Sequence, residues 1–166
     1  MDFLSYDGAF KARPMQLGRR EKRLASAYLM SVIDRTERFG VSVPCWADRN
    51  EYISVKYQAP RLLEAYAPFK IDLVVDRGGV IEIVECQYAR PLVGLGQTII
   101  KREMFRLCYG SHKELKAILV TPEKRVNNQL IRAAGEFNVR VVQILAKDEN
   151  RHNDRFVRKL LEHKGM

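Results

Sequence analysis

Two apolar runs within residues 70–87 are separated by the pair Gly78-Gly79, and they give the clearest hydrophobic pattern in the chain. These glycines suit a two-residue hairpin turn, because glycine tolerates the positive φ angles that such turns require. The pattern therefore predicts two antiparallel strands. Asp72, Glu85 and Gln87 are polar residues at strand positions where Val or Ile would be usual.

Folding the hairpin at these glycines brings Asp72 and Glu85 together at one end of the predicted sheet. Alternate residues of a strand face opposite sides, so Glu85 and Gln87 share one face while Cys86 takes the other. Two carboxylates on a low-dielectric surface repel each other unless they share a proton or bind a cation. Oxygen ligands of this kind suit Mg²⁺. The alternative is that Glu85 and Gln87 only end a strand in water.

The remaining pattern predicts the order helix, three strands, helix, strand, helix, strand and helix. Helical periodicity places the helices at residues 16–38, 95–110, 122–137 and 150–164. Apolar runs place the last two strands at residues 116–121 and 140–146. We expect residues 1–14 to form an arm, Gly40 to end the first helix and Pro122 to begin the third.

Two segments before the hairpin are harder to assign. Residues 52–57 alternate between apolar and polar, which favours an additional strand. Residues 61–67 fit either a short helix or the first core strand. Their position directly before the Asp72 strand favours the strand.

The strand-helix-strand unit from Val80 to Thr121 predicts a parallel pair joined by a right-handed crossover. Because the hairpin before it is antiparallel, the sheet is expected to be mixed, with helices on both faces. A chain of 166 residues fits a single domain with a sizeable core. The pattern alone also fits other α/β folds.

Asp72, the glycine turn and Glu85-Cys86-Gln87 resemble the PD-(D/E)XK nuclease superfamily, whose pattern is Asp, a hairpin and Glu-x-Lys. The segment 92–101 resembles a helix start in RecB-type nucleases of this superfamily, where a Gln is followed four residues later by a Tyr. Residues 17–24 are similar to the first helix of Holliday-junction resolvases. The resemblance covers roughly residues 17–121 and implies a restriction-endonuclease-like fold.

The resemblance implies a metal-dependent nuclease, with Asp72, Glu85 and the Cys86 backbone carbonyl as ligands of Mg²⁺ or Mn²⁺. Gln87 would orient the attacking water, and Glu21 would hold a metal-bound water or a second ion. The alternative for Glu21 is an acid that stabilises the first turn of its helix. Another acid of the first helix, at residue 37, is a weaker competitor.

The implied nucleic-acid contacts are Gln97, Lys101, Arg19, Arg20 and Arg90. The basic residues among them also fit solvated helix faces. The chain departs from the family in two places, since Gln replaces the motif lysine at position 87 and Lys replaces the tyrosine at position 101. We expect Lys101 to return the missing charge, because it lies one helical turn after Gln97.

The net charge of +9 favours a polyanionic partner, with nucleic acid first and DNA favoured over RNA. No segment approaches the roughly eighteen apolar residues of a membrane-spanning helix, so no membrane partner is expected. Three widely spaced cysteines and an acidic N-terminus favour reduced thiols and an intracellular location, the cytoplasm or a host's cytoplasm if the source is viral. A homodimer is possible by the same resemblance.

Three alternatives to the nuclease follow from these residues. An inactive nuclease-fold module would bind nucleic acid without cleaving it. An interaction protein would use the basic surface for another partner. Catalysis by Cys86 is disfavoured, because no histidine is near it in sequence and it faces away from Glu85.

Overall fold

The structure is a computed structural model that describes residues 4–149 apart from residues 12, 14, 47, 63–66, 111 and 112. The strands are β1 (Arg38–Cys45), β2 (Phe69–Asp76), β3 (Val80–Cys86), β4 (Glu114–Pro122) and β5 (Val139–Ile144). The α-helices are α1 (Arg19–Val32), α2 (Arg49–Gln58), α3 (Pro91–Tyr109), α4 (Asn128–Glu136) and α5 (Ala146–Glu149). The 3-10 helices are η1 (Tyr6–Phe10), η2 (Ile33–Arg35), η3 (Pro60–Leu62) and η4 (Glu123–Arg125).

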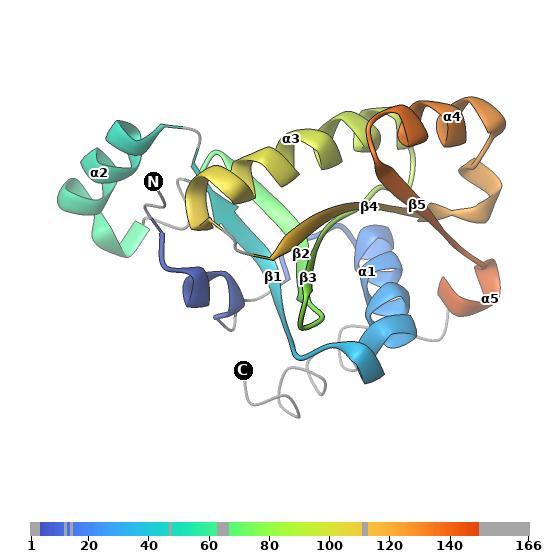
Figure 1. The fold of residues 1–166 in the computed structure, drawn as a ribbon, viewed down its shortest axis with the longest axis horizontal. Coiled ribbons are helices and arrows are strands. Elements are labelled where there is room, and N and C mark those ends of the chain that lie inside the picture. The colour runs from blue at the N-terminus through green and yellow to red at the C-terminus, as the bar shows by residue number, and fades with distance from the viewer. Residues whose placement is uncertain are drawn as a thin grey trace.

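The five strands form one mixed sheet in the order β1-β2-β3-β4-β5 (Figure 1). The pairs β1–β2 and β2–β3 are antiparallel, whereas β3–β4 and β4–β5 are parallel. This topology confirms the expected α/β class, with an antiparallel hairpin followed by parallel crossovers.

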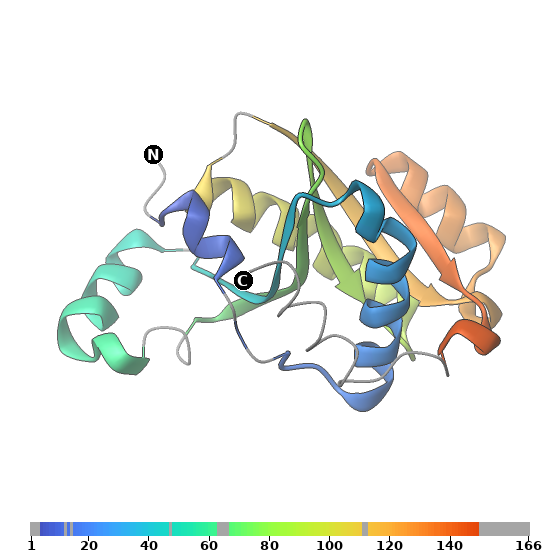
Figure 2. The ribbon, with the colours of Figure 1, turned by 90° about the horizontal axis from the view of Figure 1, so that it is seen from below.

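Helices cover both faces of the sheet, with α1 on one face and α3 and α4 on the other (Figures 1 and 2). On the α1 face, Leu24 belongs to a core cluster with Val84 of β3. On the α3 face, Phe105 belongs to a cluster with Ile81 and Ile83. The alternation predicted for β3 is therefore confirmed, and Glu85 faces α3.

The hairpin between β2 and β3 is confirmed, and so is its two-residue turn. The register pairs Asp76 with Ile81, and the Arg77 N–H donates to the Val80 backbone oxygen (2.9 Å), which leaves Gly78-Gly79 as the loop. Arg77, Gly78 and Gly79 connect the strands, and only Gly78 has a positive φ, of 82°. The Gly78 N–H donates to Asp76 Oδ1 (3.0 Å). This side-chain acceptor holds the turn against the end of β2. A positive φ at the first loop residue alone is typical of a type II′ hairpin turn.

The prediction for Gly40 was wrong, because α1 ends at Val32 and Gly40 lies within β1. A Cβ atom at Gly40 would lie only 2.0 Å from the backbone oxygen of Ala9. Glycine is needed here because η1 packs directly against β1, with Ala9 and Phe10 buried. The expected arm over residues 1–14 thus includes a docked 3-10 helix.

The strand predicted over residues 52–57 was also wrong, because these residues belong to α2. Asp48 caps this helix by accepting a hydrogen bond from the Asn50 N–H (2.7 Å). Within α2 only Tyr52 is buried, so the apparent alternation does not reflect a sheet face. The first core strand is β1.

At residues 61–67 the predicted strand is not found in the described part, since Pro60–Leu62 is 3-10 helical and residues 63–66 lie outside it. Pro122 ends β4 instead of beginning a helix, and α4 begins after Asn127, whose side chain accepts from the Leu130 N–H (2.9 Å).

Helix α3 begins at Pro91, four residues earlier than predicted. The helix expected over residues 150–164 lies outside the described residues, as do the three histidines. Within the described ranges, no helix is long and apolar enough to cross a membrane.

Candidate functional site

Asp72 and Glu85 lie just beyond the point where the β2–β3 ladder ends, at the pair Leu73–Val84. Both side chains are buried, with 6% and 5% of the residue surface exposed. The Cys86 N–H donates to Asp72 Oδ2 (2.8 Å). The Asp72 carboxylate thus accepts from a backbone N–H that lies beyond the end of the β2–β3 ladder. The sequence prediction that the two carboxylates converge is met by this geometry.

Lys101 of α3 lies against both carboxylates. Its ammonium group donates to Glu85 and lies 3.5 Å from Asp72 Oδ1, and its side chain is only 12% exposed. One cation therefore serves two buried carboxylates. The positive charge that we expected Lys101 to bring to the pair is present.

Burial raises the pKa of Asp72, although Lys101 and the Cys86 N–H act in the opposite direction. Burial and then the charge of Asp72 raise the pKa of Glu85 to about 8. Burial acts to lower the pKa of Lys101, but the two carboxylates raise it. Near neutral pH the cluster thus keeps Lys101 charged and holds an additional proton, chiefly on Glu85.

Two adjacent carboxylates fit a hard divalent cation, which binds through one or two such groups and keeps several waters. The Lys101 ammonium shows that this position attracts positive charge. No group of three or more His, Cys, Asp or Glu side chains that could hold a metal forms among the residues that the structure describes. Any metal here would therefore rely on Asp72, Glu85, backbone oxygen and water.

Cys86 has its side chain on the opposite face, in the core cluster against α1. Burial, followed by the charges of Asp72 and Glu85, raises the pKa of its thiol well above the usual value. A buried neutral thiol is a poor nucleophile. This finding supports the sequence argument against cysteine catalysis and leaves only the backbone of Cys86 for the site.

Glu21 is half-buried in the first turn of α1, and a Cβ atom at Gly18 would lie 2.5 Å from its Oε2. The charge of Glu21 contributes to the raised pKa of the Cys86 thiol, so Glu21 approaches Cys86 from the α1 face of the sheet. No contact of Glu21 with Asp72 or Glu85 occurs within the described part. The competing acid Glu37 lies elsewhere, beside the Gly78 turn.

Gln87 leaves the sheet at the end of β3, where its N–H donates to the Val120 backbone oxygen (2.9 Å). Its side chain packs closely on α3, since a Cβ atom at Gly94 would lie 2.6 Å from Gln87 Cβ. Glycine at this position lets the first turns of α3 approach β3. Gln97, two turns from Pro91, is exposed on the same helix.

The predicted nucleic-acid contacts Arg19, Arg20 and Arg90 are exposed. The Arg20 guanidinium lies 4.7 Å from the centre of the Tyr88 ring, and Lys124 Nζ lies 5.3 Å from it. Lys124 was missed in the sequence. Lys124 could have been found from the parallel pairing of β3 and β4, because this pairing brings the residues that follow both strands to one edge of the sheet.

A second pair of buried acids, Asp76 and Glu82, lies at the other end of the same two strands and was also missed. Asp76 accepts from Lys113 (2.8 Å), Arg38 (3.4 Å) and Tyr6 (3.2 Å). An acid inside an apolar run was the available signal.

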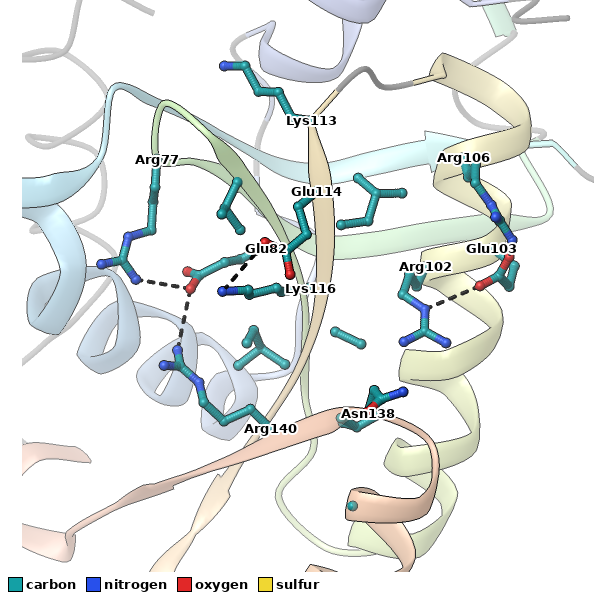
Figure 3. Close-up of a pocket in the computed structure, with 16 residues that line it drawn as sticks. Arg77, Glu82, Arg102, Glu103, Arg106, Lys113, Glu114, Lys116, Asn138 and Arg140 are labelled. Carbon is teal, nitrogen blue, oxygen red and sulfur yellow. Dashed lines mark hydrogen bonds and ion pairs between the residues drawn. The ribbon is translucent and has the colours of Figure 1, made fainter.

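Glu82 faces α1, where it accepts hydrogen bonds from Tyr28 (2.5 Å), Arg77 (3.0 Å) and Arg140 (3.4 Å). Figure 3 shows the two arginines converging on this carboxylate from different elements. Each acid at this end therefore has at least two cations of its own.

Comparisons with protein-family models, with curated proteins and with solved structures found no match. The resemblance over residues 17–121 thus stays a prediction from sequence. The geometry of Asp72, Glu85 and Lys101 carries the functional argument.

Proposed function

We propose that this protein is a metal-dependent nuclease that hydrolyses phosphodiester bonds, with DNA as the favoured substrate. The observation that carries the proposal is the buried cluster of Asp72, Glu85 and Lys101. A cation shared by two buried carboxylates whose pKa values are raised is an arrangement common at functional sites.

The arrangement of the elements supports the same proposal. A hairpin supplies both carboxylates, and the crossover helix α3 supplies the lysine on the same face of a mixed sheet. This order is the one expected of the PD-(D/E)XK superfamily, and a restriction-endonuclease-like fold is part of the proposal.

In this mechanism Asp72 and Glu85 would hold Mg²⁺ or Mn²⁺, and the Cys86 backbone carbonyl would be a further oxygen ligand. When bound, such an ion would lower the pKa of a water molecule and neutralise charge on the scissile phosphate. Lys101 supplies the positive charge that the motif lysine gives in the family. Gln87 orients water through its amide, since it carries no charge.

A metal ion would compete with Lys101 for the same carboxylates, Asp72 and Glu85. Glu85 must lose its proton, and the ammonium must move away from at least one oxygen. The flexible four-carbon stem of lysine permits such a movement. The displaced ammonium would remain near the two carboxylates and would supply positive charge toward the phosphate.

The second candidate is a nucleic-acid-binding module that has lost cleavage. The lysine is absent from position 87, and Lys101 occupies the space between the two carboxylates. The basic residues around Tyr88 would serve this function equally well.

A cleavage assay separates the two candidates. Labelled single strands, duplexes and four-way junctions of DNA, and RNA, are incubated with Mg²⁺ or Mn²⁺. We expect Asp72→Asn and Glu85→Gln to lower cleavage by more than about 100-fold, because each weakens metal binding. The matched control is Asp76→Asn, which changes a buried aspartate of the same strand away from the site.

Rates are compared at equal folded fractions, measured by circular dichroism. Cleavage that persists in Asp72→Asn would remove this site from the proposal. Tight binding with no cleavage of any substrate would favour the binding module.

A further inference from the structure

A wide groove of about 1140 Å³ lies at the end of the sheet away from Asp72 and Glu85 (Figure 3). It is lined by the first residues of β3, β4 and β5 and by the second half of α3. Nothing in the proposed mechanism uses this groove.

The groove follows a part of β4 that has a neighbour on one side only. Glu114, Leu115 and Lys116 pair with β3, but β5 joins β4 only from Ala117 onward. Within the described ranges no strand covers this edge. In a parallel ladder the backbone groups of successive residues point to alternate sides, so this edge presents backbone donors and acceptors to the groove.

The lining is basic. The acids that line it are Glu82, Glu103 and Glu114. The cations that line it are Arg77, Arg102, Arg106, Lys113, Lys116 and Arg140. In Figure 3, Arg102 and Arg106 lie on the α3 side of β4, and Arg77 and Arg140 lie on the other side.

Several of these groups retain donors for a ligand. Arg140 uses only Nη2, toward Tyr28 and Glu82, although a guanidinium has five N–H donors. The Arg140 and Arg106 side chains are 55% and 65% exposed. Lys116 is half exposed, and its contact with Glu114 is long, at 3.8 Å.

We propose that this groove is a second nucleic-acid surface, which binds the phosphate backbone away from the carboxylate site. Arginine forks match phosphate oxygens, and four of the six cations are arginines. The cations do not converge on one point but spread over several elements, which suits a chain of phosphates better than one small anion. The net charge of +9 favours the same partner.

The inference rests on the proposed nucleic-acid partner but not on cleavage. Helix α3 connects the two surfaces, because Lys101 contacts the carboxylates while the next residue, Arg102, lines the groove. Backbone held in the groove would therefore lie along the helix that completes the site.

The test is a binding titration of a labelled DNA duplex in EDTA at several salt concentrations. The groove variant is Arg106→Gln with Lys116→Gln, two side chains that are each at least half exposed. The control variant is Arg35→Gln with Lys56→Gln, which removes the same charge from exposed positions outside the groove.

We expect the groove variant to lose about 10-fold or more in affinity and to lower the slope of log K against log salt by roughly 2. The control variant should stay within about twofold of the natural protein. Equal losses in both variants, or none in the groove variant, would overturn the inference.

A competition arm uses polyglutamate of the same charge as the duplex. The groove takes acidic peptides, and the inference fails, if polyglutamate binds as tightly as the duplex and if the groove variant weakens the binding of polyglutamate but not that of DNA. If the groove variant loses binding while no substrate is cleaved, the cleavage proposal fails and the inference stands. If a substrate is cleaved but binding does not depend on Arg106 and Lys116, the cleavage proposal stands and the inference about the groove fails.

Discussion

Strands β2 and β3 carry two pairs of buried acids, and the two ends of this strand pair neutralise them differently. At one end, Asp76 and Glu82 each have their own cations and a tyrosine hydroxyl. At the other end, Asp72 and Glu85 share Lys101. The residue types and the strands are the same, but the surroundings differ. Asp72 and Glu85 share one face of the sheet and one lysine, whereas Asp76 and Glu82 lie on opposite faces, each with its own cations and a tyrosine hydroxyl.

The pKa values follow this difference. Burial acts to raise the pKa of Asp76, but Lys113 and the Gly78 N–H lower it below its usual value. At the Asp72 end, the charge of the single lysine does not offset the rise in pKa that burial causes, so the pKa values of both Asp72 and Glu85 are raised. Thus the first pair is built for stability, whereas the second retains a need for positive charge that a metal ion can meet.

The largest expected effect is the loss of cleavage when Lys101 is replaced. If this lysine supplies the catalytic charge, Lys101→Met should lower metal-dependent cleavage by about 100-fold or more. Gln87→Lys restores the motif lysine, so it should change the natural protein little and recover most of the activity in the Lys101→Met background. A double-mutant cycle on single-turnover rates measures this coupling. Additive effects of the two changes would contradict the shared role.

The next largest effect is a difference in the free energy of unfolding between variants of the two aspartates of β2. Asp76→Asn removes the charge that pairs with Lys113 and Arg38, and we expect a loss of about 2–3 kcal/mol in the free energy of unfolding. Asp72→Asn should cost less than about 1 kcal/mol, because its amide oxygen can still accept from Cys86 and repulsion with Glu85 is relieved. Urea unfolding at pH 8 in EDTA measures both. Equal losses would show that the two ends are equally structural.

A smaller effect concerns pH. Between the usual pKa of 4.5 and the raised value of about 8, the folded protein holds a proton on Glu85 that the unfolded chain has released. The folded state binds more protons in this window, so the free energy of unfolding falls as the pH rises through it. The value of about 8 already includes the effect of Lys101, and the slope in the middle of the window should reach at most about 1.4 kcal/mol for each pH unit.

The measurement is urea unfolding of the metal-free protein from pH 5 to pH 9. Glu85→Gln should flatten the decrease, because it removes the group that titrates. The exposed Glu136→Gln is the control and should follow the natural protein. The same pH dependence in all three proteins would remove Glu85 as the cause.

Much of the carboxylate end was predictable, because it depends on local pattern. The glycine turn fixed which strands pair, and strand parity placed Glu85 on the face opposite Cys86. Lys101 was inferred from the family resemblance and from its helical spacing to Gln97. Its contact with both carboxylates depends on where α3 crosses the sheet, which no local pattern gives.

The errors arose where a residue serves a distant contact. Gly40 suggested a helix end, but it is required by the approach of Ala9 from a segment about thirty residues away in the sequence. Residues 52–57 suggested a strand because apolar and polar residues alternate there, but they form part of α2, in which only Tyr52 is buried. The cations of Asp76 and Glu82 come from several elements, so their convergence could not be read from spacing.

The smallest effect tests how closely α3 must approach the carboxylate end, using two glycines of one helix. A Cβ atom at Gly94 would lie 2.6 Å from Gln87 Cβ and 2.9 Å from Leu119 Cδ1, whereas at Gly96 nothing lies within 4 Å. Gly94→Ala should therefore destabilise the fold by about 1–2 kcal/mol, because the helix must move away from β3. Gly96→Ala should stabilise it by about 0.5–1 kcal/mol through helix propensity alone. If α3 positions Lys101, Gly94→Ala should also lower cleavage at full folding, and Gly96→Ala should not. Urea unfolding and single-turnover cleavage of both variants measure this, and equal behaviour of the two would show that the close approach at Gly94 has no part in the site.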